Sequence, residues 1–261
     1  MHELKIKDLS FSYKGDDRLI LKDIDLDVES GEFVCLLGQS GCGKSTFLRL
    51  LAGLETSTGG TIMLGDQLMS GASLNRGVVF QDYGLFPWMT AGENIMLALK
   101  QKFPKEDKKK LKQLALDTLK LVGLDESVYR KLPKELSGGM KQRCAIAQAF
   151  SIDPPILLMD EPFGALDAVT RARLQDLVLR LWSQDKQKKT VFFVTHDVDE
   201  ALLLASRIIV FGQSPSSIIY DCSIPANKRP TRETQFENTE ILELRNDLIL
   251  QINKDVASRI S

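Results

Sequence analysis

The segment from Gly38 to Thr46 constrains the fold of this chain more than any other part of the sequence. It reads Gly-Gln-Ser-Gly-Cys-Gly-Lys-Ser-Thr and directly follows Phe33–Leu37, a short continuous apolar run. Such a run is typical of a strand that is buried on both faces. The pattern G-x-x-x-x-G-K-[ST], placed after a strand and before a helix, is typical of a loop that wraps around phosphate groups. The sequence therefore predicts a strand, a phosphate-binding loop and a helix in that order.

The chemistry of this loop depends on its glycines and on a few side chains. Glycines let the backbone curl so that successive N–H groups face one anion, and the start of the next helix adds partial positive charge. We expect Lys44 to reach the β- and γ-phosphates of a nucleotide, and the Ser45 hydroxyl to ligate Mg²⁺, a cation that prefers oxygen donors. Nearby donors favour a thiolate at Cys42, which predicts that its alkylation blocks nucleotide binding and that Mg-ATP protects it; the alternative is that Cys42 is only a small residue that fits the loop. The remaining residues expected to contact the nucleotide are Gly38, Ser40, Gly41, Gly43 and Thr46.

A second apolar run, Ile156–Met159, ends in the acidic residues Asp160 and Glu161. The tip of a strand beside a phosphate-binding loop can deliver a carboxylate to Mg²⁺, and we assign this role to Asp160. Neighbouring residues of a strand point to opposite sides, so Glu161 is expected to act as the general base that orients or deprotonates the attacking water. The acidic pair and the loop together favour hydrolysis of a nucleoside triphosphate.

A second helix start with anion-binding character is expected at Ser137-Gly138-Gly139. Serine is a preferred N-cap residue, and a helical stretch from Cys144 to Phe150 follows the two glycines. One ATP needs only one phosphate loop. We therefore expect these three residues to contact the nucleotide that is held by a second copy of the chain.

The rest of the sequence predicts one α/β body with an inserted helical lobe. Leu4–Val28 alternates between polar and apolar residues around a turn at Gly15-Asp16-Asp17, which favours an antiparallel sheet at the start of the chain. Further apolar runs are separated by helical patterns, which favours a largely parallel sheet. These runs are Gly77–Phe80, Val191–Thr195 and Arg207–Phe211.

Two regions outside these strands are expected to differ from the sheet. From about residue 91 to 150, apolar residues such as Leu111, Leu114 and Leu119 recur at helical spacing, so this stretch is the expected lobe. After Phe211 the chain is expected to be less regular, and to end in an amphipathic helix from about Thr239 to Asn253.

Composition excludes several other classes of protein. The net charge of −1 does not fit a strongly basic face, so we expect no nucleic-acid partner. No run approaches the roughly 20 apolar residues that cross a bilayer, and the first residues lack the apolar stretch of a signal peptide. The four cysteines form no C-x-x-C pair and are expected to be reduced thiols.

These motifs resemble those of the nucleotide-binding subunits of ABC transporters, in the family's order and over nearly all of the chain from Leu4 to Phe211. Gly38–Thr46 resembles the Walker A motif, Leu136–Arg143 the ABC signature and Ile156–Glu161 the Walker B motif. The resemblance also implies roles for four single residues. Gln81 would be the Q-loop glutamine that senses metal and γ-phosphate, Asp167 would belong to the D-loop, His196 would be the switch histidine on the γ-phosphate, and Tyr13 would stack on adenine. For the last role Phe11 is the alternative.

The resemblance implies a P-loop NTPase of RecA-like fold, with an ATPase domain over residues 1–230 and a helical tail over residues 231–261. It also implies a catalytic set of Lys44, Gln81, Glu161 and His196, a metal set of Ser45, Gln81 and Asp160, and ATP and Mg²⁺ as cofactors. Two copies would pair head to tail. Together they would sit on membrane permease subunits at the cytoplasmic face of the membrane, and would serve an extracytoplasmic solute-binding protein indirectly.

Finer likeness points to the nitrate, sulfonate and taurine importers, on Gln81–Thr90, Glu161–Asp167 and Thr195–Ala201. Polyamine and glycine-betaine importers share several of these strings and are the alternative. The apolar loop around Trp88 would receive a helix of the permease, although packing within the lobe is the alternative. Met140 departs from the glutamine that many members carry after the two glycines. The competing interpretations are an ABC ATPase that is not coupled to transport and a P-loop kinase or GTPase. Among ABC ATPases not coupled to transport, DNA-repair proteins insert a long coiled coil between Walker A and the signature, and ribosome-acting proteins generally carry two nucleotide domains; this sequence shows neither feature. A kinase or GTPase does not need a signature motif.

Overall fold

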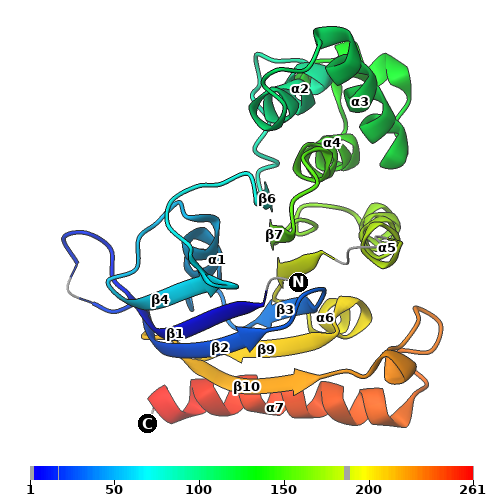
Figure 1. The fold of residues 1–261 in the computed structure, drawn as a ribbon. Coiled ribbons are helices and arrows are strands. Elements are labelled where there is room, and N and C mark those ends of the chain that lie inside the picture. The colour runs from blue at the N-terminus through cyan, green and yellow to red at the C-terminus, as the bar shows by residue number, and fades with distance from the viewer. Residues whose placement is uncertain (1–2, 17, 185–188, 261) are drawn as a thin grey trace. The chain divides into compact units, whose positions relative to one another are not determined.

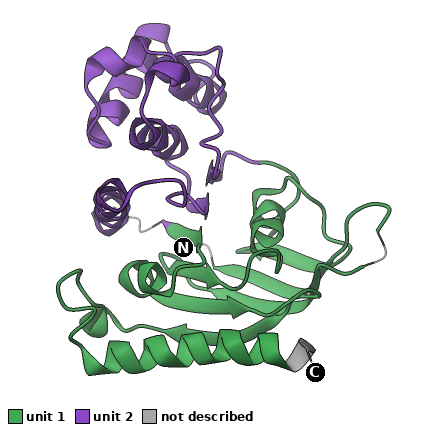
Figure 2. Ribbon diagram, turned by 180° about the vertical axis from the view of Figure 1, so that it is seen from behind, with its two compact units in different colours: residues 1–72, 190–261 green, residues 73–189 purple. Residues whose placement is uncertain are grey.

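The computed structural model describes residues 3–16, 18–184 and 189–260 of the 261-residue chain (Figure 1). The chain forms two compact units, which Figure 2 distinguishes by colour. The first unit contains residues 1–72 and 190–261, and the second contains residues 73–189. The helix at the end of the chain therefore belongs to the same unit as the phosphate-binding loop.

The first unit begins with the antiparallel sheet that the alternating sequence predicts. Its strands are β1 (Leu4–Phe11), β2 (Leu21–Val28), β4 (Gly59–Leu64) and β5 (Gln67–Leu68), in the order β2-β1-β4-β5. The alternation places Leu4, Ile6, Leu9 and Phe11 in the core. The pairing with β2 shifts register after Ile6, where Asp8 has a φ of 48°.

The second sheet of this unit is mainly parallel. β3 (Phe33–Leu37) pairs in parallel with β8 (Thr190–Val194) and with β9 (Arg207–Phe211), and every residue of β3 and β8 is buried. β10 (Ile218–Ser223) pairs antiparallel with β9, so the expectation of an irregular chain after Phe211 is wrong at this strand. Its residues are only half-buried or exposed, and it therefore lacks the continuous apolar run of a strand that is covered on both faces.

Helices of the first unit cover this sheet. They are α1 (Lys44–Ala52), α6 (Val198–Leu204), α7 (Thr239–Ile260) and the 3₁₀ turn η3 (Ala226–Lys228). Phe47 of α1 packs against Phe192 and Phe211, with ring centroids 6.4 and 5.2 Å apart. This packing fixes the helix that follows the phosphate-binding loop onto the strands below it.

The second unit has two parallel strands and a helical region. β6 (Arg76–Val79) pairs with β7 (Ile156–Asp160). The helices are α2 (Ala91–Lys102), α3 (Lys108–Leu121), α4 (Gly138–Ser151) and α5 (Ala168–Ser183), with the 3₁₀ turns η1 (Glu126–Arg130) and η2 (Pro133–Glu135). Each of the four helices begins after a polar cap: Thr90, Asp107, Ser137 and Asp167 accept hydrogen bonds from backbone N–H groups of their first turns.

Candidate functional site

The phosphate-binding loop depends on backbone conformations that favour glycine. Gly43 caps α1 with a φ of 103°, and no side chain accepts a hydrogen bond at this helix start. A Cβ at Gly38, whose φ is 148°, would lie 2.6 Å from the carbonyl oxygen of Phe211. The first amides of α1 therefore face the loop without a capping side chain, which is the arrangement that binds an anion.

Lys44 lies inside this loop rather than in solvent. Its Nζ donates hydrogen bonds to the carbonyl oxygens of Gly38 and Gln39, both at 2.8 Å, and lies 3.7 Å from the Cys42 sulfur. Lys44 and Cys42 are both buried, whereas Ser40, Gly41 and Ser45 are exposed. The ammonium charge is therefore already held at the centre of the loop, where phosphate oxygens can exchange with the carbonyl groups.

The parallel sheet brings His196 to the same edge as the loop. Leu36 of β3 lies opposite Val194 of β8, and the Thr195 N–H donates to the Leu36 carbonyl at 3.2 Å. The phosphate-binding loop starts two residues after Leu36, and His196 follows two residues after Val194. His196 is exposed, and the next residue, Asp197, caps α6.

The structure distinguishes the two aromatic candidates near the start of the chain. The Phe11 ring is buried, with 2% of the residue exposed, whereas Tyr13 is 37% exposed. The two rings meet edge to face with centroids 4.9 Å apart. The Tyr13 hydroxyl lies 3.1 Å from Oγ1 of Thr46, which ends the loop motif. Tyr13 is therefore the ring that a ligand can reach.

In the second unit, a matching strand pair brings Gln81 and Glu161 to one edge. Val79 of β6 lies opposite Met159 of β7. Gln81 follows two positions after Val79, and Glu161 follows two positions after Met159. A Cβ placed on Gly164 would lie 3.8 Å from Oε2 of Glu161 and 4.0 Å from Nε2 of Gln81, so both side chains border this glycine. Asp160 is the last residue of β7.

The predicted second anion-binding helix start is also formed. Ser137 caps α4 and accepts a hydrogen bond from the Met140 N–H at 3.3 Å, so the helix begins earlier than Cys144. Both glycines are closely packed: a Cβ on Gly139 would lie 2.6 Å from the Thr170 side chain, and a Cβ on Gly138 would lie 3.2 Å from the Tyr83 hydroxyl, a tight contact.

Asp167 has a structural role in this unit. Its carboxylate caps α5 by accepting from the Thr170 N–H at 3.0 Å, and hydrogen bonds from Thr170 lower its pKa.

Comparison with known proteins decides the family. The sequence matches the model of the ABC transporter family over residues 21–164. It is 42% identical to the nitrate import ATP-binding protein NrtD of Synechococcus elongatus over 230 residues, which cover 88% of this chain and 83% of that protein. This chain belongs to the ABC transporter family.

Other comparisons agree with this assignment. The bicarbonate transport ATP-binding protein CmpD of Synechocystis sp. is 40% identical over 87% of the ABC chain and 80% of its own length. Among solved structures, the dimeric post-hydrolysis state of the ATP-binding cassette MJ0796 bound to ADP and Pi superposes with a TM-score of 0.75 at 31% identity. That match covers 85% of this chain and 99% of the cassette. The predicted P-loop NTPase fold and the predicted ATPase activity are thereby confirmed.

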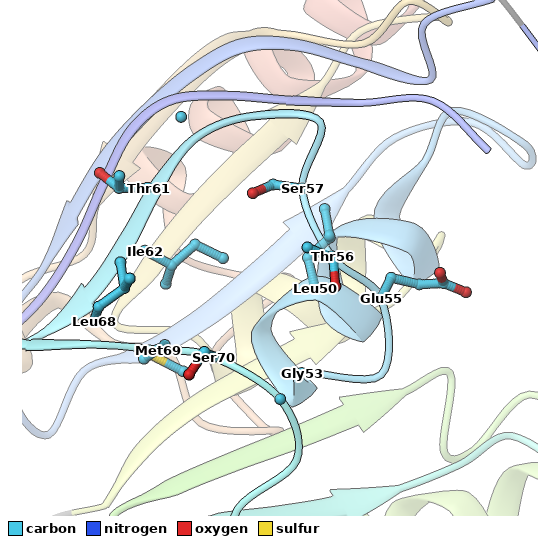
Figure 3. A pocket seen from close by; sticks show the side chains of 12 residues that line it. Leu50, Gly53, Glu55, Thr56, Ser57, Thr61, Ile62, Leu68, Met69 and Ser70 are labelled. Atoms are coloured by element: carbon cyan, nitrogen blue, oxygen red, sulfur yellow. The ribbon is translucent and has the colours of Figure 1, made fainter. Parts of the chain in front are cut away.

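The ABC chain has a cavity that is distinct from these motifs (Figure 3). It measures about 200 Å³ and is lined by residues from the C-terminal end of α1, such as Leu50 and Gly53, and by Ile62 and Leu68 of β4 and β5. Lys44 lies at the opposite end of α1. None of the predicted site residues lines this cavity, so the nucleotide site is defined by loops and strand ends and not by this cavity.

Sequence reasoning missed Asn94, which organises the apolar loop of this ABC protein. Asn94 is fully buried. Its Oδ1 accepts from the Phe86 N–H at 2.8 Å, and its Nδ2 donates to the carbonyl oxygens of Phe86, Met89 and Thr90 at 3.0 to 3.3 Å. The sequence signal for this role is weak. Asn94 is a polar residue in the first turn of a helix that begins with a capping box, but this position does not show which backbone groups its side chain will bond.

Among the residues that the structure describes, no helix is long and apolar enough to cross a membrane. All four cysteines lie in the described part of this ABC chain, and none of them forms a disulfide. Burial raises the pKa of Cys144 to about 12 and that of Cys222 to about 11, so both thiols stay protonated at neutral pH.

Proposed function

We propose that this ABC ATPase powers a membrane importer of a small solute of the nitrate, bicarbonate, sulfonate or taurine class. It would do so as a head-to-tail dimer at the cytoplasmic face of the membrane. The proposal of an importer is supported by the similarity to a nitrate import protein and a bicarbonate transport protein. The proposal of a dimer is supported by the dimeric cassette that the chain resembles.

One observation supports the mechanism: in each unit, predicted site residues follow the carboxyl ends of paired parallel strands. The first unit offers the phosphate-binding loop with Lys44 and His196, and the second offers Gln81 and Glu161. In this proposal Lys44 binds the β- and γ-phosphates, His196 contacts the γ-phosphate and Tyr13 stacks on adenine. Glu161 takes a proton from the attacking water as the water oxygen forms a bond to the γ-phosphorus. The bond between the γ-phosphorus and the β–γ bridging oxygen breaks, and ADP leaves with that electron pair.

The signature residues would complete the site of a second copy. The sequence contains the phosphate-loop motif once, and the start of α4 at Ser137-Gly138-Gly139 provides a second set of backbone N–H donors. Placed against the γ-phosphate of the partner's ATP, these donors and the helix dipole would stabilise negative charge. Asp167 would lie at the same dimer contact.

The residues present also fit a magnesium ion. Ser45, Gln81 and Asp160 are oxygen donors, which Mg²⁺ prefers, and Ser45 is exposed at the start of α1. No group of three or more His, Cys, Asp and Glu residues that could hold a metal occurs in the described part of the chain. Mg²⁺ does not require such a group, because phosphates and waters usually supply most of its ligands. When bound, the ion would offset charge that develops on the phosphates.

The permease would dock on the loop of residues 85–89. Trp88 is 70% exposed and its ring lies 5.4 Å from that of Phe86, so two large aromatic groups form one patch. Exposed aromatic patches on an otherwise polar surface mark protein interaction sites. The solute-binding protein would act through the permease and not touch this chain.

The proposal is tested with Glu161→Gln. This change keeps the shape of the side chain and removes the base, so ATP binding should persist while turnover falls about 1,000-fold. The trapped protein should elute as a dimer from gel filtration with Mg-ATP and as a monomer without it. Normal turnover by this variant would refute the assigned base, and a monomer in the presence of bound ATP would refute the shared site.

A further inference from the structure

The C-terminal helix α7 lies along β10 and next to α6 in the first unit (Figure 1). Ile241 and Leu248 are buried, and they stand seven residues apart on one helix face. Arg245 lies on the same face between them, at i+4 from Ile241. A charged residue is thus built into the apolar stripe that packs α7 onto the unit.

Arg245 joins α7 to the segment that contains the switch histidine. Its Nε donates to Oδ1 of Asp199 at 2.6 Å, and an Nη donates to Oδ2 of the same residue at 3.3 Å. About a third of each side chain is exposed, and two-point pairing of this kind is more specific than a single contact. Asp199 lies three residues after His196, in the first turn of α6.

From Asp199 the contacts continue on both sides of His196. Asp197 Oδ1 accepts from the Asp199 and Glu200 N–H groups, and the Asp197 N–H donates to Oγ1 of Thr195 at 3.0 Å. That hydroxyl donates to the buried Glu200 carboxylate at 2.6 Å. The backbone before and after His196 is therefore held by a network whose outer end is the ion pair with α7.

Asp255 of α7 makes a second connection, to the phosphate-binding loop. Its Oδ2 accepts from the Gln213 N–H at 2.8 Å, just after the end of β9. The Gln213 side chain donates to Oε1 of Gln39 at 3.5 Å, the outer limit of a hydrogen bond. Gln39 also provides one of the two carbonyl oxygens that hold Lys44.

We infer that α7 positions two segments of the ATP site in the first unit, the backbone around His196 and the phosphate-binding loop. Arg245 and Asp255 are then positioning residues for ATP hydrolysis. Arg245 acts through Asp199 on the backbone of His196, and Asp255 acts through Gln213 on the phosphate-binding loop. Neither side chain is expected to touch ATP. The inference rests on the proposed role of His196 at the γ-phosphate.

The experiment compares Arg245→Gln, Asp199→Asn and the double variant in the full chain. Each should lower kcat about 3- to 10-fold with KM changed less than about twofold, because His196 is proposed to act after ATP is bound. The double variant should be no slower than the slower single variant, because both changes remove one ion pair. Arg245→Lys should recover part of kcat.

Glu240→Gln is the matched control. Glu240 pairs with Lys228 at 2.8 Å, so the change also breaks an ion pair of α7, but one that leads to no site residue. Its kcat should stay within about 1.5-fold of the unmodified chain, as is usual for a surface ion pair. Asp255→Ala, in contrast, should raise KM more than it lowers kcat, because its contacts lead to the phosphate-binding loop.

Amide hydrogen exchange of residues 195–200, measured without nucleotide, provides a readout that does not need turnover. Exchange there should be faster in Arg245→Gln and unchanged in Glu240→Gln. Unchanged exchange, additive losses in the double variant, or an equal loss of kcat in Glu240→Gln would overturn the inference. An unmodified chain that does not hydrolyse ATP would instead refute the proposed function, while the exchange result would still judge the role of α7.

Discussion

Glu161 has a φ of 41°, in the left-handed region that residues with a side chain rarely adopt. Such a conformation costs of order 1–3 kcal/mol, and the fold must hold it in place. The strain falls on the residue that is proposed to act as the base, directly after the metal-binding candidate Asp160. At this residue stability would favour glycine, which adopts a positive φ without strain, whereas the proposed catalytic role requires a carboxylate side chain.

This conflict predicts a difference between two inactive variants. Glu161→Gly and Glu161→Gln both remove the carboxylate, but glycine adopts a positive φ without strain. We expect the glycine variant to be more stable than the glutamine variant by about 0.5–1 kcal/mol in urea denaturation. A glycine variant that is less stable than the glutamine variant would show that side-chain contacts outweigh the strain.

Lys44 is held inside the phosphate-binding loop by backbone carbonyl oxygens, and this position supports its proposed role in binding phosphate. Replacement by alanine removes the charge at the centre of the loop, where it makes two hydrogen bonds at 2.8 Å. Transferred to phosphate oxygens, two charge-assisted bonds amount to about 3 kcal/mol or more, so ATP affinity should fall at least about 100-fold. Titration with a fluorescent ATP analogue measures this, with Arg49→Ala, an exposed change on the same helix, as the control. Retained affinity in Lys44→Ala would contradict the assignment.

At the scale of elements, the loop of residues 85–89 shows how a helix can hold a binding surface. Asn94 belongs to the first turn of α2, and its amide satisfies three backbone groups of the loop, namely the N–H and C=O of Phe86 and the C=O of Met89. Where water cannot reach these backbone groups, loss of the bonds would leave them buried and unpaired, which is costly. The exposed ring of Trp88 thus owes its place to a residue that solvent does not reach.

Asn94→Ala should therefore loosen the loop more than it disturbs α2. We expect a loss of about 2–3 kcal/mol in stability from the unpaired groups. Near residue 88, proteolysis should be faster, and the ATP affinity should be unchanged. Lys100→Ala, an exposed change on the same helix, should have no effect on either stability or proteolysis. Equal protection of the loop in both variants would show that Asn94 is not its support.

The docking role of the loop has its own test. Trp88→Ala should weaken capture of the membrane complex and leave nucleotide affinity intact, because the ring lies on the proposed permease surface and forms no part of the ATP site. Co-purification of the variant with the permease measures this. Assembly at the normal yield would assign the patch to packing within the lobe.

At the scale of the whole molecule, the shared site predicts how defects combine in mixed dimers. With Lys44→Ala in one protomer and Ser137→Ala in the other, one of the two sites keeps both of its parts. With both changes in the same protomer, each site lacks one part. We expect trapped ATP in the first arrangement, at about one per dimer, and none above background in the second. Equal trapping in the two arrangements would contradict a shared site.

Much of the fold was predictable because its strongest signals are local. β3 and β9 have the predicted bounds, β7 is one residue longer than predicted, and β6 and β8 each lie one residue earlier, since continuous apolar runs mark buried parallel strands. The short strands β4 and β5 and the edge strand β10 were missed because they are largely exposed or half-buried. Ser137 is the cap of α4 as predicted, because cap chemistry acts within one turn.

The sequence by itself determined which motifs this protein carries: the loop around Lys44, the acidic pair at the end of β7 and the signature helix start are each contiguous in the chain, so their spacing is sufficient to recognise them. Only the tertiary structure decided that Phe11 is buried and Tyr13 accessible, that Asn94 holds the aromatic loop, and that Arg245 reaches Asp199 across 46 positions of the chain. The physical reason is that burial and pairing between distant segments depend on which faces of the elements pack together. A local sequence pattern does not specify which distant segment a residue will contact.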